Sequence, residues 1–163
     1  MALNNGIYCR GKLLHLHILD PPNALCPFFS ISTETISHLF IHCHHTWSLW
    51  SKICRWWGVK WSAPRDLTSL FSQWFLLGGN YNSTSSWISI LFSTPWSIWL
   101  ARNNLIFRNK EVDWERLFDI ILLRCITWIR AKHPSFPLHL TDLLTNVDSL
   151  KCWRGSKCRL SFS

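Results

Sequence analysis

Residues 36 to 58 read ISHLFIHCHHTWSLWSKICRWWG, and the apolar pattern of this stretch indicates the fold class. Its large apolar side chains recur every three or four residues, and a glycine follows the last of them. This spacing places them on one face of an α-helix, and glycine commonly ends a helix. The sequence predicts a helix from about residue 32 to 57, bent near Cys43, with apolar positions Ile36, Leu39, Phe40, Cys43, Trp47, Trp50, Cys54 and Trp57.

Further helices are expected on both sides of the middle of the chain. Asp66 and Asp113 can each cap the free amides at a helix start, and Pro95 should kink or divide the helix that contains it. Residues 1 to 31 are rich in Gly, Pro and Asn, which predicts loop. The expected helices span residues 66–77, 85–107 and 113–133, with a shorter one within 138–150.

The composition limits the class of protein. Apolar residues make up 48% of the 163 residues and charged residues 16%, which argues against disorder over most of the chain. The formal net charge of +8 favours contact with phosphate through counterion release, without sequence preference. No charged residue lies between Asp66 and Arg102, but polar residues and Pro95 interrupt the apolar run. It falls short of the roughly 18 apolar residues of a spanning helix, so membrane insertion is not expected.

The cysteines indicate reduced thiols. Their number is odd and no secretory signal is evident, so a disulfide framework explains them poorly. We expect a nuclear or cytoplasmic protein. The seven are Cys9, Cys26, Cys43, Cys54, Cys125, Cys152 and Cys158.

Two short segments resemble a known metal-binding pattern. They are Cys26-Pro27-Phe28-Phe29 and Glu34-Thr35-Ile36-Ser37-His38-Leu39-Phe40-Ile41-His42-Cys43. Plant LINE-type retroelement reverse transcriptases carry a similar zinc-binding segment after the polymerase, C-x2-C-x8-H-x4-C, with a Trp-rich helix behind it. On this pattern Cys26, His38 and Cys43 fall on three ligand positions and Phe29 falls on the fourth.

Physical chemistry supports this spacing. A C-x2-C turn presents two thiolates to one ion, and a His and a Cys on a following turn complete a tetrahedron. Phenylalanine donates no lone pair, so the resemblance implies a weakened zinc site. His42, one turn beyond His38 on a helix, is the favoured replacement ligand. The alternative is a dead site in which the thiols are simply buried.

A second stretch, Trp96-Ser97-Ile98-Trp99-Leu100-Ala101-Arg102-Asn103-Asn104-Leu105-Ile106-Phe107, is similar to the W-x2-W-x2-R-N-x3-F signature downstream in the same elements. We interpret it as a helix with Trp99 and Phe107 in the core and the Arg-Asn pair on the surface. The resemblance covers roughly residues 7 to 150. It implies an all-α chain in which a small Cys/His zinc-knuckle-like segment precedes a bundle of about four helices. The expected divisions are a degenerate zinc-binding segment (1–58), a Trp-rich helical region (59–150) and a basic tail (151–163).

The sequence argues against an enzyme. A polymerase needs paired aspartates for two metal ions, and the chain has no Asp-Asp. Glu34 is interpreted as a favourable charge in a helix's first turn rather than as a general base.

The resemblance implies a non-catalytic zinc module that grips RNA or DNA without sequence specificity and takes no small-molecule substrate. A decayed fragment that binds no metal and has no biochemical activity is the alternative. The candidate phosphate contacts are Lys12, Arg55, Lys60, Arg102, Arg108 and Lys110.

Overall fold

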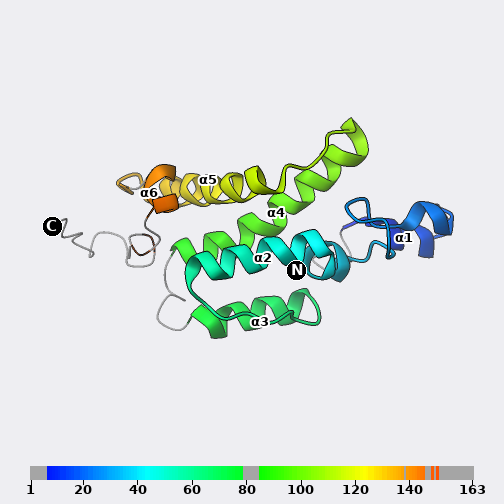
Figure 1. Ribbon diagram of the computed structural model, residues 1–163, viewed down its shortest axis with the longest axis horizontal. Helices are drawn as coiled ribbons and strands as arrows, with labels where there is room; N and C mark the ends of the chain where they lie inside the picture. The colour runs from blue at the N-terminus through cyan, green and yellow to red at the C-terminus, as the bar shows by residue number, and fades with distance from the viewer. Residues whose placement is uncertain (1–6, 79–84, 138, 146–147, 149, 151–163) are drawn as a thin grey trace. The chain divides into compact units, whose positions relative to one another are not determined.

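The computed structural model describes residues 7–78, 85–137, 139–145, 148 and 150. Within these residues the only β pairing is an isolated antiparallel bridge between Leu25 and Thr33. The predicted all-α fold class is confirmed, and the Cys/His segment precedes the four long helices. In chain order the elements are α1 (Arg10–His15), the 3-10 turn η1 (Pro21–Ala24), the π-helical turn η2 (His38–His42), α2 (His44–Trp57), α3 (Leu67–Gly78), α4 (Ser85–Arg108), α5 (Trp114–Lys132) and α6 (Leu140–Thr145) (Figure 1).

The first predicted helix is bent at Cys43, as expected. The residue has an extended backbone, with φ −61° and ψ 135°, and it separates η2 from α2. Gly58 follows α2 in the left-handed region, with φ 79°. Its amide donates to the Arg55 carbonyl, and the Val59 amide donates to the Cys54 carbonyl. These two bonds satisfy carbonyls that a helix end would otherwise leave free.

Two predicted helix caps are confirmed. The Asp66 carboxylate accepts a hydrogen bond from the Ser69 amide at 2.8 Å, and this bond lowers the pKa of Asp66. The Asp113 carboxylate accepts from the Arg116 amide at 2.9 Å. Each aspartate thus satisfies a free N–H group in the first helical turn.

Pro95 lies inside α4 but does not divide it, because the helix runs unbroken from Ser85 to Arg108 (Figure 1). Proline cannot donate the backbone bond to the carbonyl one turn earlier. Neighbouring hydroxyls add bonds to other helix carbonyls: Thr94 Oγ1 donates to the Ile90 carbonyl at 2.8 Å and Ser97 Oγ to the Ser93 carbonyl at 2.7 Å. The two hydroxyls are therefore satisfied within the helix, one on each side of the proline.

The expectation of loop throughout residues 1 to 31 was wrong, because α1 and η1 lie there. Tertiary contacts explain α1: the Gly11 amide donates to the Glu34 carbonyl at 2.9 Å. A Cβ on Gly11 would lie 2.7 Å from that oxygen, so only glycine permits this approach. Local pattern alone could not reveal a helix fixed by a residue so distant in sequence.

The chain folds into two compact units, Met1–Gln73 with Ile98–Val112, and Trp74–Ser97 with Asp113–Ser163. The second half of α4 therefore belongs with the Cys/His segment. The boundaries expected at residues 58 and 150 rest on resemblance rather than on contacts, and they stay a prediction.

The first unit buries one face of α2 together with η2. Trp50 is fully buried, and its indole N–H donates to the Phe40 carbonyl of η2 at 2.8 Å. Each turn of α2 adds buried apolar side chains to this core, so the helix is held by tertiary packing. The α2 residues in the core are Leu49, Trp50, Ile53, Cys54 and Trp57.

The second unit centres on two stacked indoles. The rings of Trp74 and Trp87 are 4.3 Å apart at 18°, and both side chains are buried. Each indole N–H donates to the backbone carbonyl of the other tryptophan, at 3.0 and 3.1 Å. The α5 residues of this core are Leu117, Phe118, Ile121, Leu122, Cys125, Ile126 and Ile129.

The described cysteines are all buried, and none of them forms a disulfide with another described cysteine; they are Cys9, Cys26, Cys43, Cys54 and Cys125. Cys152, Cys158 and the predicted basic tail lie outside the described residues. Of the helices in the described part of the chain, none combines the length and apolar character needed to cross a membrane.

Candidate metal centre

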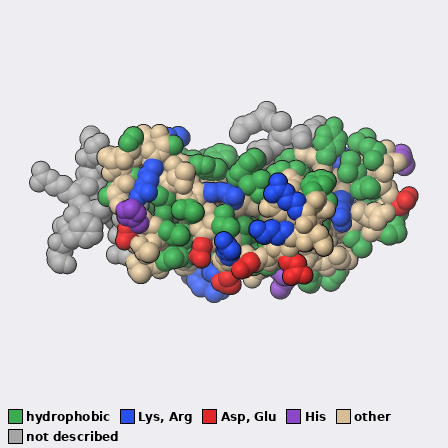
Figure 2. Space-filling model, turned by 90° about the horizontal axis from the view of Figure 1, so that it is seen from above, with side chains coloured by type: hydrophobic (Ala, Val, Ile, Leu, Met, Phe, Trp, Pro, Cys, Tyr) green, Lys and Arg blue, Asp and Glu red, His purple; other side chains and the backbone are tan. Residues whose placement is uncertain are grey.

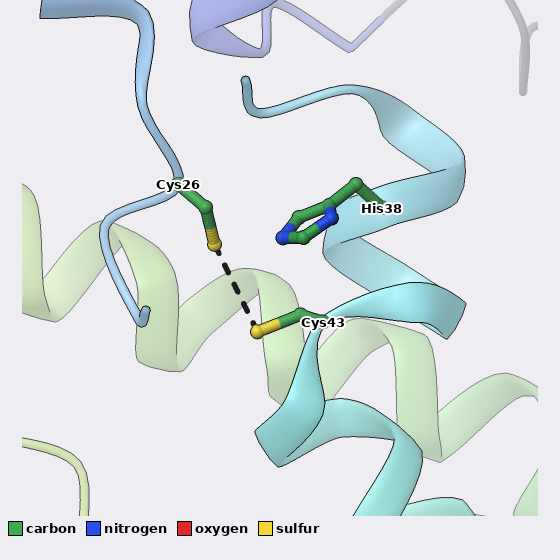
Figure 3. A group of neighbouring side chains, drawn as sticks. All are labelled: Cys26, His38 and Cys43. Carbon is green, nitrogen blue, oxygen red and sulfur yellow. Dashed lines mark hydrogen bonds between the residues drawn. The ribbon is translucent and has the colours of Figure 1, made fainter. Parts of the chain in front are cut away.

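Three of the predicted ligands converge on one point. Cys26 comes from the loop after η1, His38 begins η2, and Cys43 joins η2 to α2. One ligand atom from each lies within 4.8 Å of the other two (Figure 3). The group could therefore hold a metal ion, as its spacing predicted.

The wide turn of η2 explains how His38 and Cys43 meet. Residues five apart on an ordinary α-helix point about 140° away from each other, because each residue turns the helix by about 100°. Here the Cys43 amide donates to the His38 carbonyl at 2.7 Å, the bond of a π-helical turn. This wider turn brings both side chains to the same side, and such turns are frequent at functional sites.

The separation of the two sulfurs fits a tetrahedral ion. The Sγ atoms of Cys26 and Cys43 are 3.8 Å apart, with the Cys26 thiol donating to Cys43 (Figure 3). Two sulfurs bound tetrahedrally at 2.3 Å from zinc would also be about 3.8 Å apart. Both residues are fully buried, which protects such a pair from solvent.

The His38 imidazole adds a second indication. Its Nε2 atom is buried and has no hydrogen-bond partner. Leaving a buried polar atom unpaired costs about 1–3 kcal/mol, so native proteins rarely do so. Figure 3 shows the ring turned toward the two sulfurs, where a cation would become its partner.

The electrostatics favour one thiolate at neutral pH. The hydrogen bond from Cys26 lowers the pKa of Cys43 to about 7, and the backbone N–H groups of His45 and Thr46 act in the same direction. The pKa of Cys26 is raised, first by its hydrogen bond to Cys43 and then by burial. Above pH 7 the pair therefore holds about one proton, which an incoming metal ion would displace.

Phe29, at the fourth position of the pattern, lies against histidine rings. Its ring stacks on the His44 ring, with 5.4 Å between the ring centres, and meets the His45 ring edge-on, with 5.7 Å between the centres. Phe29 is 40% exposed. His42, the favoured replacement ligand, is exposed, and its Nε2 contacts the Arg65 carbonyl at 3.1 Å. The structure therefore does not bring His42 into the group.

Arg102 was predicted as a phosphate contact, and this was wrong because the side chain is buried. It forms an ion pair with Glu34, which is fully buried, at 2.7 Å. Glu34 also precedes η2 rather than lying in a helix's first turn. Phe107, predicted in the core, is 74% exposed, whereas Trp99 is half-buried.

The sequence contained a signal for this pair that our interpretation did not use. Glu34 is the only Asp, Glu, Lys or Arg between Asp20 and Lys52, and Arg102 is the only one between Asp66 and Arg108. An isolated charge in a long apolar stretch is buried more often with a partner than without one. The isolated negative charge of Glu34 and the isolated positive charge of Arg102 therefore indicate that the two residues pair with each other.

The other candidate phosphate contacts belong to the first unit and are at least partly accessible. Lys12 is half-buried, with its Nζ 4.8 Å from the centre of the Tyr8 ring. On the face drawn in Figure 2, Lys and Arg side chains lie among acidic and hydrophobic ones. The exposed members of the set are Arg55, Lys60, Arg108 and Lys110.

The fold and the site together define an all-helical, tryptophan-rich chain with a Cys/His group suited to a metal ion. Comparisons with protein families, with curated proteins and with solved structures found no match. Any inference of function must therefore be drawn from the sequence and from the geometry of the described residues.

Proposed function

We propose that this chain is a non-catalytic module that binds zinc through Cys26, His38 and Cys43 and contacts RNA or DNA without sequence specificity. The observation that carries the proposal is the convergence of two buried thiols and an unpartnered imidazole nitrogen on one point. The motifs quoted above support descent from a retroelement reverse transcriptase, whose zinc-binding segment has Cys, His and Cys ligands at the positions of Cys26, His38 and Cys43.

Zinc is favoured over the hard cations Mg²⁺ and Ca²⁺ by the chemistry of the donors. Thiolate and imidazole ligands suit zinc, whereas Mg²⁺ and Ca²⁺ require oxygen ligands. Both cysteines are fully buried, which favours a structural role over the activation of a substrate. Phe29 supplies no donor, so a fourth ligand such as water must come from outside the group, and the affinity is expected to be lower than with four protein ligands.

Metal content of the purified protein tests the zinc site. We expect about one zinc per native chain, and substantially less in the His38→Ala and Cys43→Ser variants. His42→Ala is the matched control, because this imidazole lies outside the group and should leave the zinc content unchanged. A native chain without zinc that keeps its helicity in zinc-free buffer would contradict the proposal.

Binding to nucleic acid is tested by fluorescence anisotropy with a labelled single strand over a series of salt concentrations. If the five accessible basic residues contact phosphates, the slope of log K against log salt is about −3 to −4. Arg108→Ala and Lys110→Ala should each reduce its size by about 0.7 for every sequence tested. Lys132→Ala, an exposed change in the second unit, is the control. No binding at low salt would remove the nucleic-acid part of the proposal.

One observation favours a second candidate. Phe29 occupies a ligand position, which is what decay of an inherited zinc site would produce. On this alternative the chain is a helical fragment without metal or biochemical activity. The same metal analysis separates the two, because the fragment would contain no zinc and His38→Ala would change nothing but local packing.

A further inference from the structure

We propose that the buried ion pair between Glu34 and Arg102 positions the metal ligands, so that Arg102 is a positioning residue of the metal centre although it lies 68 residues from its partner. This inference rests on the proposed metal binding and adds to it the role of the Arg-Asn pattern on α4. Both residues belong to the first unit.

The guanidinium grips the carboxylate with two parallel bonds. Arg102 Nε donates to Glu34 Oε1 at 2.9 Å, and Nη2 donates to Oε2 at 2.7 Å. The backbone amide of Arg10, the first residue of α1, donates to the same Oε2 at 2.6 Å. One carboxylate thus joins α1, the loop of the metal centre and α4. Two parallel bonds fix direction as well as distance, which a single point charge would not do.

Glu34 lies in sequence between the ligands Cys26 and His38, and its backbone closes the loop that contains Cys26. Its amide donates to the Ala24 carbonyl at 2.9 Å, which closes the loop that contains Cys26. The Cys26 amide donates to the Ser32 carbonyl at 2.8 Å within this loop. Cys26 comes eight residues before Glu34 and His38 four residues after it, so the ion pair anchors the chain between the two donors.

The remaining faces of the guanidinium are also held. Its central carbon lies 5.0 Å from the centre of the Trp99 ring, and Nη1 donates to the Asn103 side-chain oxygen at 3.1 Å. Trp99 and Asn103 of the W-x2-W-x2-R-N pattern therefore both contact the guanidinium of Arg102. This explains the spacing: one turn of helix separates the stacking tryptophan from the arginine, and the asparagine follows directly.

Stability alone does not require a charge pair at this place. A buried pair is often no more stabilising than apolar residues of the same volume, because desolvation offsets the attraction. What it adds is one defined geometry, and the loop that it fixes holds Cys26 and leads into His38. Outer contacts that orient ligands typically change metal affinity about 10–100-fold.

Cobalt(II) titration of the full chain tests the proposal, because the ion reports both affinity and geometry through its absorption bands. We expect Arg102→Met to weaken cobalt binding at least about tenfold and to change the ligand-field bands at saturation. Arg102→Lys, which keeps the charge but loses the two-bond grip, should recover part of the affinity. Leu70→Ala is the control, because this buried α3 residue of the same unit makes the core less stable without belonging to the loop.

A purely structural role predicts a different result. Arg102→Met and Leu70→Ala would then lower stability alike, while both kept the native cobalt affinity and spectrum, and the proposal would be overturned. If Arg102→Met does not fold, Glu34→Asp tests the same contact, because it shortens the side chain by one methylene. The proposal would also be overturned if both Glu34→Asp and Arg102→Lys bound cobalt with native affinity. A native chain that binds no cobalt or zinc defeats the proposed function itself, and this inference with it.

Discussion

The two units of the chain satisfy their buried polar groups in different ways. In the second unit the hydroxyls of Thr94 and Ser97 donate to carbonyls one turn back on α4, and Trp74 and Trp87 exchange hydrogen bonds. In the first unit the Nε2 atom of His38 has no hydrogen-bond partner. It lies near the Cys26 and Cys43 thiols, which are joined to each other by one hydrogen bond. These described polar groups of the second unit are thus satisfied by their own polypeptide, whereas the Cys/His group of the first unit leaves an imidazole nitrogen that a metal ion could bind.

Removal of the metal should give the largest effect and should act on the first unit. A ligand at a thousandfold excess over its dissociation constant stabilises the form that binds it by about 4 kcal/mol. Chelation should therefore reduce hydrogen-exchange protection of the α2 amides by that order, and leave α5 amides such as that of Ile121 nearly unchanged. Equal loss of protection in both helices, or none in either, would remove the distinction between the units.

A restored fourth ligand should strengthen the first unit. Phe29→Cys adds a thiolate to the turn whose backbone N–H groups at Phe28 and Phe29 already favour the Cys26 thiolate. We expect zinc affinity to rise about a hundredfold, as measured by competition with a chelating dye, because a structural zinc site is normally completed by four ligands. Phe29→Ser removes the ring without adding a thiolate, and it should leave the affinity near the native value. Equal affinities in the two variants would show that the turn does not face the ion.

The second unit should respond to a change in its indole pair and ignore zinc. Trp74→Phe removes the hydrogen bond to the Trp87 carbonyl and part of the stacked ring. The free energy of unfolding should fall by about 1–2 kcal/mol, since one net hydrogen bond and some buried area are lost. Urea denaturation measures it. The loss should be the same with zinc and with chelator, and a loss seen only with zinc would contradict the independence of the unit.

The pH dependence of zinc binding should change slope near neutrality. The pKa of Cys43 is lowered to about 7, so its thiolate forms above that pH and is lost as the pH falls through 7, whereas Cys26 keeps its proton because its pKa is raised. Zinc must therefore displace about one thiol proton above pH 7 and about two below it. As the pH is lowered, the apparent affinity should fall about tenfold per unit down to pH 7 and more steeply below it. A slope that did not change near 7 would disagree with the lowered pKa.

The sequence predicted the parts that depend on local pattern. The helical spacing around Trp50, the caps at Asp66 and Asp113 and the stop at Gly58 were all confirmed. The convergence of the three ligand residues was predicted as well, because they lie within 18 positions of one another and a turn suffices to bring them together.

What depends on distant partners was missed. The pairing of Glu34 with Arg102 crosses 68 positions, and the short helix at Gly11 forms because a carbonyl far along the chain accepts its amide. Phe107 has the chemistry of a core residue, but it lies near the end of α4 and remains exposed. Helical periodicity predicts which side chains share a face of a helix, but it does not predict which face another segment of the chain will cover.

X-ray absorption at the zinc edge of the native protein tests the central claim most directly, because it reports the atoms around the ion. The account predicts two sulfurs at about 2.3 Å and an imidazole nitrogen at about 2.0–2.1 Å, with one further light atom. The sulfur contribution should halve in Cys43→Ser. A shell of nitrogen and oxygen alone, or protein that takes up no zinc at all, would contradict the account.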